Sequence, residues 1–202
     1  MIGIIDYNMG NSGSVKRKFD RLQSNSFVSN NIAELSKADK LVMPGVGHFG
    51  NAIEQIKKLN LWDFINESVL IKKKPILGIC LGMQIMAKTS EEGNEEGFGW
   101  FDANVIKFKV SDTFQFKIPH IGWNDTFIQK KSKLFDNISN NDFYFVHSYH
   151  IECNDKQDIL TTTNYDYEFV SAIEKDNIFG CQFHPEKSHS QGDQLFKNFI
   201  QL

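Results

Sequence analysis

Short apolar runs alternate with segments of helical spacing along the first half of the chain. The runs at residues 2–5, 40–43 and 75–80 are apolar at nearly every position, which is typical of strands buried on both faces of a sheet. Apolar residues three or four apart in the segments between them are typical of helices. The pattern predicts strands at 2–5, 27–28, 40–43 and 75–80, and helices at 14–22, 31–38, 52–58, 61–71 and directly after 80.

The second half of the chain has a different pattern. Between residues 98 and 151, short strand-like runs are separated by Asn, Asp, Ser and Lys, without helical spacing. Residues 144–149 are the strongest strand candidate there, and the glycine-containing segment 119–124 is expected to be a loop. The remaining prediction comprises strands at 159–163, 169–174 and 178–183 and a closing helix at 192–202.

The order of these elements predicts an α/β fold, in which helices flank a central, mostly parallel sheet. The runs between 98 and 151 are expected to form an antiparallel excursion from that sheet. With 202 residues, of which 41% are hydrophobic, the chain can bury a sizeable core. We therefore expect one domain over residues 1–202, with its ligand site outside the carboxyl ends of the parallel strands.

The candidate chemistry centres on Cys80, which stands between Gly78 and Gly82 where a strand meets a helix. This Gly-x-Cys-x-Gly pattern is the thiol counterpart of a nucleophile elbow, a tight turn that exposes the reactive side chain. Backbone N–H groups and the dipole at a helix N-terminus favour thiolate over thiol. A lone cysteine in an apolar run is commonly a small buried hydrophobe, but the paired glycines favour a nucleophile.

A base for this thiol is predicted near the other end of the chain, where His184 and Glu186 flank a proline. Residues two apart in an extended segment point the same way, so the carboxylate can hold one ring nitrogen while the other faces the sulfur. Cys80, His184 and Glu186 would then form a catalytic triad. Taken alone, such a segment is more often an ordinary turn at a strand end, and it is the elbow at Cys80 that favours the catalytic pair.

The sequences around these residues, Gly-Ile-Cys-Leu-Gly-Met-Gln and Phe-His-Pro-Glu-Lys-Ser, resemble those of class I glutamine amidotransferases. Within that superfamily, further stretches resemble the glutaminase subunits of imidazole glycerol phosphate synthases, and together they cover the chain from end to end. These stretches are residues 6–11, 43–47, 90–93, 119–124 and 144–149. The resemblance implies hydrolysis of L-glutamine through a cysteine thioester, with ammonia passed to a synthase of L-histidine biosynthesis.

The resemblance also implies roles for residues around the triad. The backbone amides of Val46 and Leu81 would form an oxyanion hole, and Gly45, Gln84 and Glu92 would bind the substrate. The carboxylate of Glu92 would meet the ammonium group of glutamine. Without the resemblance, a turn between a strand and a helix is the commoner explanation of residues 44–47.

The resemblance further implies a partner, a (β/α)8-barrel cyclase or synthase subunit in a heterodimer. Asn11, Trp123 and Lys187 would lie at the interface with it. A tryptophan in a glycine-containing loop commonly anchors an interface, although one folded back on the core has the same sequence signature.

Composition and charge argue against nucleic-acid binding, a membrane span and secretion. A net charge of -3 lacks the basic footprint of a nucleic-acid-binding protein. No apolar run approaches the roughly 20 residues that span a bilayer. Three cysteines cannot all pair with one another, and the N-terminus lacks the basic region of a secretory signal, so we expect a cytoplasmic protein.

No metal or cofactor is expected. The acidic residues between 91 and 96 lack the regular spacing of a calcium loop, and the chain has no Walker or Gly-x-Gly-x-x-Gly pattern. His147 and His150, three apart in a predicted strand, would point to opposite faces and could not share a metal.

Two alternatives share much of this pattern. A paralogue with the same glutaminase chemistry, serving a synthase that modifies a nucleotide-linked sugar, would have the same motifs around the triad. A non-catalytic binding or regulatory subunit would be expected to have lost a triad residue, and this chain keeps all three.

Overall fold

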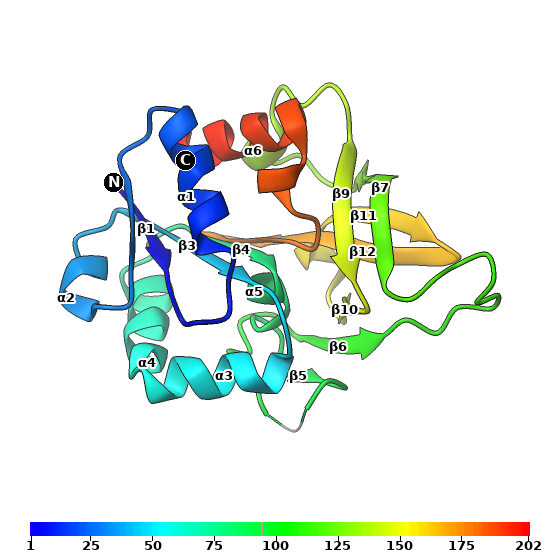
Figure 1. The fold of residues 1–202 in the computed structure, drawn as a ribbon, viewed down its shortest axis with the longest axis horizontal. Coiled ribbons are helices and arrows are strands. Elements are labelled where there is room, and N and C mark those ends of the chain that lie inside the picture. Colours follow the sequence, from blue (N-terminus) through cyan, green and yellow to red (C-terminus); the bar gives the residue numbers. More distant parts are fainter. Residues whose placement is uncertain (94) are drawn as a thin grey trace.

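The computed structural model describes residues 1–93 and 95–202, and in them helices cover both faces of a central sheet (Figure 1). Eleven strands of this part of the chain form one sheet, in the order β2-β1-β3-β4-β13-β12-β10-β6-β5, with β11 pairing to β12 and β8 to β11. A second, two-stranded sheet contains β7 and β9. The predicted α/β fold class is confirmed.

One half of the large sheet is parallel, and its strands are short and, apart from the half-buried edge strand β2, almost wholly buried. They are Ile2–Ile5 (β1), Ser26–Ser29 (β2), Lys40–Gly45 (β3), Ile76–Cys80 (β4) and Ile178–Cys181 (β13). Because these strands run the same way, the loops after β1, β3, β4 and β13 meet at one rim of the sheet.

The other half is mainly antiparallel. Its strands are Thr89–Ser90 (β5), Ala103–Lys107 (β6), Phe127–Ile128 (β8), Tyr149–Cys153 (β10), Ile159–Tyr165 (β11) and Tyr167–Lys175 (β12). The small sheet pairs His120–Asp125 (β7) with Asp142–His147 (β9). The expected meander through β11, β12 and β13 is confirmed, and it returns the chain to the edge of β4.

The helices form two layers. They are Ser12–Arg21 (α1), Ile32–Leu35 (α2), Phe49–Lys58 (α3), Leu61–Asn66 (α4), Leu81–Gln84 (α5) and His189–Gln201 (α6). A π-helical turn, Glu67–Ile71, extends α4, and three 3₁₀ turns lie at Lys133–Phe135, Lys156–Asp158 and Pro185–Lys187. Helices α1 and α6 lie on one side of the parallel strands, with α3 and α4 on the other (Figure 1).

Alternation along the strands supplies both layers with a hydrophobic core. On β3, Val42 packs into the cluster that contains Phe19 of α1 and Phe196 of α6, whereas Met43 packs into the cluster that contains Ile53 of α3. All five side chains are fully buried. A strand covered on both faces must be apolar at successive positions, which explains the continuous apolar runs of the sequence.

Two segments expected to be loops are parts of strands. β3 continues through Pro44 and Gly45, which pair with Ile79 and Cys80 of β4. Trp123 lies on β7, opposite Tyr144 of β9. Proline and glycine predicted loops there, but hydrogen bonds to a neighbouring strand hold both segments extended.

The strand expected at residues 144–149 is divided at Ser148. β9 belongs to the small sheet, whereas β10 pairs with β6 and β12 in the large one. The chain therefore changes sheets at Ser148, and a single serine within a strand-like segment was not enough to predict the change.

Candidate active site

Cys80 occupies a strained turn at the end of β4. Its backbone has φ 54° and ψ −112°, a conformation that residues other than glycine rarely adopt and that costs about 1–3 kcal/mol. α5 begins at the next residue, so the strand reverses into the helix at Cys80 itself. The close packing of β3 behind the turn leaves no space for a side chain at Gly82. The predicted elbow is therefore present.

The helix after the elbow is shorter than the sequence predicted. α5 has only four residues, Leu81–Gln84, because the chain leaves helical geometry after Ile85. The dipole of a helix grows from aligned peptide units, and a single turn aligns few of them. The helix therefore supplies less of a dipole at Cys80 than the sequence predicted.

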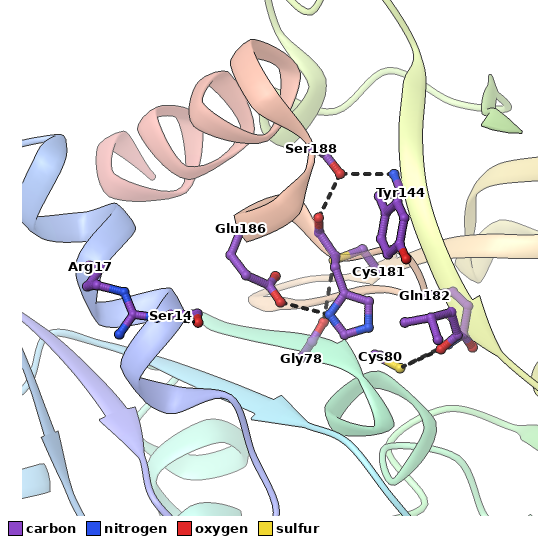
Figure 2. Close-up of polar contacts among 11 residues, drawn as sticks. Ser14, Arg17, Gly78, Cys80, Tyr144, Cys181, Gln182, Glu186 and Ser188 are labelled. Atoms are coloured by element: carbon purple, nitrogen blue, oxygen red, sulfur yellow. Dashed lines mark hydrogen bonds and ion pairs between the residues drawn. The ribbon is translucent and has the colours of Figure 1, made fainter. Parts of the chain in front are cut away.

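His184 and Glu186 are brought together as the sequence predicted, although by a different local structure. Pro185–Lys187 is a 3₁₀ turn, not an extended segment. His184 Nδ1 lies 2.8 Å from Glu186 Oε1, and both side chains are buried. Ser188 holds this turn in place, because its hydroxyl donates to the His184 carbonyl and accepts from the Tyr144 N–H of β9 (Figure 2).

The opposite edge of the imidazole faces the elbow. Nε2 of His184 makes no hydrogen bond of ordinary geometry among the described residues, and Cys80 is close enough to the imidazole to affect its pKa. Burial opposes a charge on His184, but a thiolate at Cys80 and the carboxylate of Glu186 outweigh burial and raise the pKa of His184. The site therefore favours the protonated form of His184.

A cavity of about 280 Å³ opens in front of the cysteine. Its lining includes Cys80, Leu81, Gln84, Glu92 and residues 146–149. Glu92 is anchored at one side, because its Oε2 accepts a hydrogen bond of 2.9 Å from the Phe49 N–H at the start of α3. The cavity thus has a thiol at one end and a fixed carboxylate in its wall.

Gln84 uses its amide nitrogen within the protein. Nε2 donates to the Tyr149 carbonyl at 3.0 Å and to Gln182 Oε1 at 2.9 Å. Its carbonyl oxygen accepts no hydrogen bond from the described residues, and the side chain lines the cavity. An acceptor is therefore available there for a ligand with a positive charge or an N–H group.

Gly45 and Val46 are placed differently from the prediction. Gly45 is not among the described residues that line the cavity, and the Tyr7 hydroxyl and the start of α5 occupy the space that a side chain at Gly45 would need. Val46 does line the cavity, but its N–H donates to the Met9 carbonyl at 2.7 Å. In this conformation the Val46 N–H is therefore engaged within the protein, and the Leu81 amide lies beside Cys80 at the start of α5.

His147 in the wall of the cavity has a defined tautomer. Its Nδ1 lies 2.8 Å from the Tyr149 carbonyl, which can only accept, so Nε2 carries no proton and accepts from His120 Nδ1 at 3.1 Å. Burial lowers the pKa of both rings, that of His120 to about 4. These two histidines are therefore neutral at physiological pH.

The expectation that His147 and His150 point to opposite faces is wrong. Both rings contact Phe108, with centroid distances of 5.1 and 4.7 Å. The alternation of side chains is interrupted where the chain changes sheets at Ser148. Among the residues that the structure describes, no group of three or more His, Cys, Asp or Glu side chains is placed to hold a metal ion.

Two of the three residues expected at an interface lie on one surface. Trp123 is 42% exposed and stacks on His189 at 4.9 Å, with Tyr144 at its edge. The exposed Lys187 places its ammonium group 5.3 Å from the centre of the Tyr144 ring. Asn11 lies elsewhere along the chain, at the residue before α1, where its carbonyl accepts from the first turn.

The sequence analysis missed two residues of the site. Ser188 supports the His184 turn, and Gln182 directs an amide nitrogen at the Cys80 sulfur from 3.5 Å. A signal for Gln182 was present, since it is the one polar residue in the apolar run 178–183. A polar residue buried at the end of a strand commonly has a specific partner.

Comparison with known proteins agrees with this geometry. The family model for glutamine amidotransferase class-I matches residues 4–202. Imidazole glycerol phosphate synthase subunit HisH 2 of Methanococcus maripaludis is 50% identical over 201 residues, covering 99% of this chain and 98% of that protein. Subunit HisH 1 of Campylobacter jejuni is 44% identical over 204 residues and is covered completely, as is this chain.

The solved structure of a glutamine amidotransferase from Thermotoga maritima matches with a TM-score of 0.66. It is 19% identical, and the match covers 99% of this chain and 80% of that one, so it supports the fold alone. Because the family model and both relatives span essentially the whole chain, this protein belongs to the class-I glutamine amidotransferases, a family of glutamine-hydrolysing enzymes.

Proposed function

We propose that this chain is the glutaminase subunit of imidazole glycerol phosphate synthase. It hydrolyses L-glutamine to L-glutamate and ammonia, and the ammonia passes to a cyclase subunit in L-histidine biosynthesis. The observation that carries the chemistry is Cys80 on a strained elbow, with the His184 ring held by Glu186 on its other side. Support for the pathway comes from relatives that are named imidazole glycerol phosphate synthase subunits and align along the whole chain.

The reaction follows from the placement of the triad. The Cys80 thiolate attacks the side-chain amide carbon of glutamine, and a carbon–sulfur bond forms as the carbonyl oxygen takes up negative charge. Protonated His184 gives its proton to the amide nitrogen, the carbon–nitrogen bond breaks, and ammonia leaves. His184 then removes a proton from water, which attacks the thioester, releases glutamate and restores the thiolate. Glu186 keeps the imidazole oriented and stabilises its charged form.

Glutamine binds in the cavity in front of Cys80. Its ammonium group meets the Glu92 carboxylate, and the Gln84 carbonyl oxygen adds a second acceptor in the wall. Gly45 contributes by leaving space for Tyr7 behind the elbow and does not contact the substrate. This modifies the role that the resemblance implied for Gly45.

The oxyanion hole is incomplete in this conformation. The Leu81 amide adjoins the sulfur, but the Val46 amide is hydrogen-bonded to Met9. A rotation of the peptide between Gly45 and Val46 would break that bond and direct the N–H toward the reacting carbonyl. One missing oxyanion donor costs roughly 3 kcal/mol, or a 10²- to 10³-fold lower rate. We therefore expect the isolated chain to be a poor glutaminase.

The partner is a (β/α)8-barrel cyclase or synthase subunit, and the two chains form a heterodimer. Its docking surface includes the exposed Trp123 and Lys187 around Tyr144, with Asn11 at the start of α1. Binding of the partner with its acceptor would switch the Val46 peptide and so avoid release of ammonia without an acceptor. We place the complex in the cytoplasm, where the three free cysteines of this chain would stay reduced. The described residues contain no helix that is both long and apolar enough to cross a membrane.

The test compares glutamine turnover by the chain alone, with the cyclase subunit, and with that subunit plus its acceptor ligand. We expect a rise of 10²-fold or more in the last case. Equal rates in all three would refute the switch but not the triad. Absence of turnover in every case would favour a non-catalytic subunit.

One observation favours a second candidate function, in which the ammonia goes to a different synthase. Methanococcus maripaludis has both a HisH 1 and a HisH 2 among the relatives of this chain. Two copies in one organism allow one of them to supply ammonia to a different synthase, such as one that modifies a nucleotide-linked sugar. Purifying the complex and identifying the synthase subunit would decide between the two acceptors.

A further inference from the structure

Gln182 places a buried amide against the nucleophile. The residue follows β13 directly, its side chain is 0% exposed, and Nε2 lies 3.5 Å from Cys80 Sγ (Figure 2). Burying an amide is unfavourable unless its polar atoms find partners. The Cys80 sulfur is therefore one of the partners that satisfy the buried Gln182 amide. Neither His184 nor Glu186 takes part in this contact.

Neighbouring groups determine which end of the amide faces the sulfur. The Tyr149 carbonyl can only accept, so the Gln84 side chain must direct its NH₂ group there. The same NH₂ group lies 2.9 Å from Gln182 Oε1, which accepts from it. The NH₂ group of Gln182 is then at the opposite end, facing Cys80. A reversed Gln182 would set two NH₂ groups against each other and an amide oxygen against the sulfur.

A hydrogen-bond donor at this position would stabilise negative charge on the Cys80 sulfur, which the elbow shields from water. Cys80 is 7% exposed, so a thiolate there has little contact with water. α5 is a single turn and supplies little dipole. Hydrogen bonds to an ion are about twice as strong as those between neutral groups, and they strengthen further away from water.

We propose that Gln182 is a catalytic residue, which stabilises the Cys80 thiolate by donating a side-chain N–H to the sulfur. Gln84 is the positioning residue that holds this amide in the donating orientation. The inference rests on the proposed role of Cys80 as the nucleophile. It gives Gln84 a second task, since its oxygen faces the cavity while its nitrogen fixes Gln182.

The test is the pH dependence of Cys80 alkylation by iodoacetamide in the full chain, followed by peptide mass spectrometry so that Cys80 is measured separately. In Gln182→Met, which keeps the length of the side chain but has no donor, the midpoint should rise by about one pH unit, a tenfold weaker ionisation. Gln84→Met should also raise it, by less, because the Gln182 amide stays in place but is free to turn over.

Cys181→Ala is the matched control. Cys181 is the preceding residue and is also buried, but its thiol faces the Gly78 carbonyl at 3.8 Å. This variant should leave the midpoint unchanged, and thermal unfolding checks that all variants are folded. With the cyclase subunit present, Gln182→Met should lower kcat and leave KM for glutamine unchanged, because Gln182 is not among the described residues that line the cavity.

The outcomes separate this inference from the proposed function. A wild-type midpoint near the ordinary cysteine value of about 8.5 would overturn the role of Cys80 itself. A low wild-type midpoint that Gln182→Met and Gln84→Met both leave unmoved would overturn the role of Gln182 alone. A rise in Cys181→Ala as large as in Gln182→Met would show general disturbance of the strand end and would also overturn it.

Discussion

Replacing Gly82 with alanine should disrupt the elbow, because the backbone of β3 passes directly behind it. The new Cβ would lie 2.8 Å from the Met43 carbonyl carbon, and closer still to the oxygen. That is 0.6 Å short of the 3.4 Å at which ordinary contact begins, and no flexible side chain can yield. We expect a loss of about 1–3 kcal/mol in the free energy of unfolding, the usual cost of overpacking.

Activity should suffer more than stability. Movement of the elbow away from β3 also moves Cys80, and a misplacement of ~1 Å can cost about 100-fold in rate. The measurements are thermal unfolding and glutamine turnover with the cyclase subunit. For a chain of this size, the expected destabilisation corresponds to a fall in Tm of roughly 2–12 °C.

Gly13→Ala provides the matched control. A Cβ at Gly13 on α1 would lie 3.6 Å from the nearest atom, at the end of the Arg17 side chain, which is ordinary contact. Alanine in a helix is favoured over glycine by about 0.5–1 kcal/mol, so this variant should keep its activity and match or exceed the wild-type Tm. A Gly82→Ala protein that melted and turned over like wild type would refute the reasoning.

Three further predictions concern titrating and reacting groups. Cys80→Ala should lower the rate of glutamine hydrolysis by about 10⁴-fold or more, while the cyclase subunit still uses ammonium salts. The double variant with His184→Ala should be little slower than Cys80→Ala, because the triad acts as a unit. Losses that multiply in the double variant would contradict this. Glu186→Gln should be milder and should lower the pKa of His184, followed by NMR titration, because one of the groups that raise it is lost; an unmoved titration would exclude that influence. Burial holds the pKa of His120 at about 4, below its unfolded value, so its contribution to stability is complete above about pH 6.5 and is lost as pH falls toward 4. In His120→Phe the fall of Tm between about pH 6.5 and 4 should be shallower than in wild type. An identical dependence of Tm on pH would show that His120 does not cause it.

The sequence by itself determined the features that depend on near neighbours along the chain. Strands covered on both faces must be apolar at successive positions, so the parallel half of the sheet was predictable from residues 2–5, 40–43 and 75–80. The elbow was predictable because a strand, a reactive residue and a helix follow within a few positions around Cys80. His184 and Glu186 are separated by one residue, so their side chains can meet in either an extended segment or a 3₁₀ turn. The contact was therefore predicted correctly, although the 3₁₀ turn was not.

Only the tertiary structure decided which distant groups complete the site. The N–H that faces the Cys80 sulfur comes from Gln182, 102 residues away, and the Val46 amide is bonded to Met9 in a different loop. The local sequence around Trp123 indicated a loop, but pairing with β9 made it a strand. Hydrogen-bond donors and acceptors take the partners that the fold places beside them, and local sequence patterns carry little information about partners from other elements.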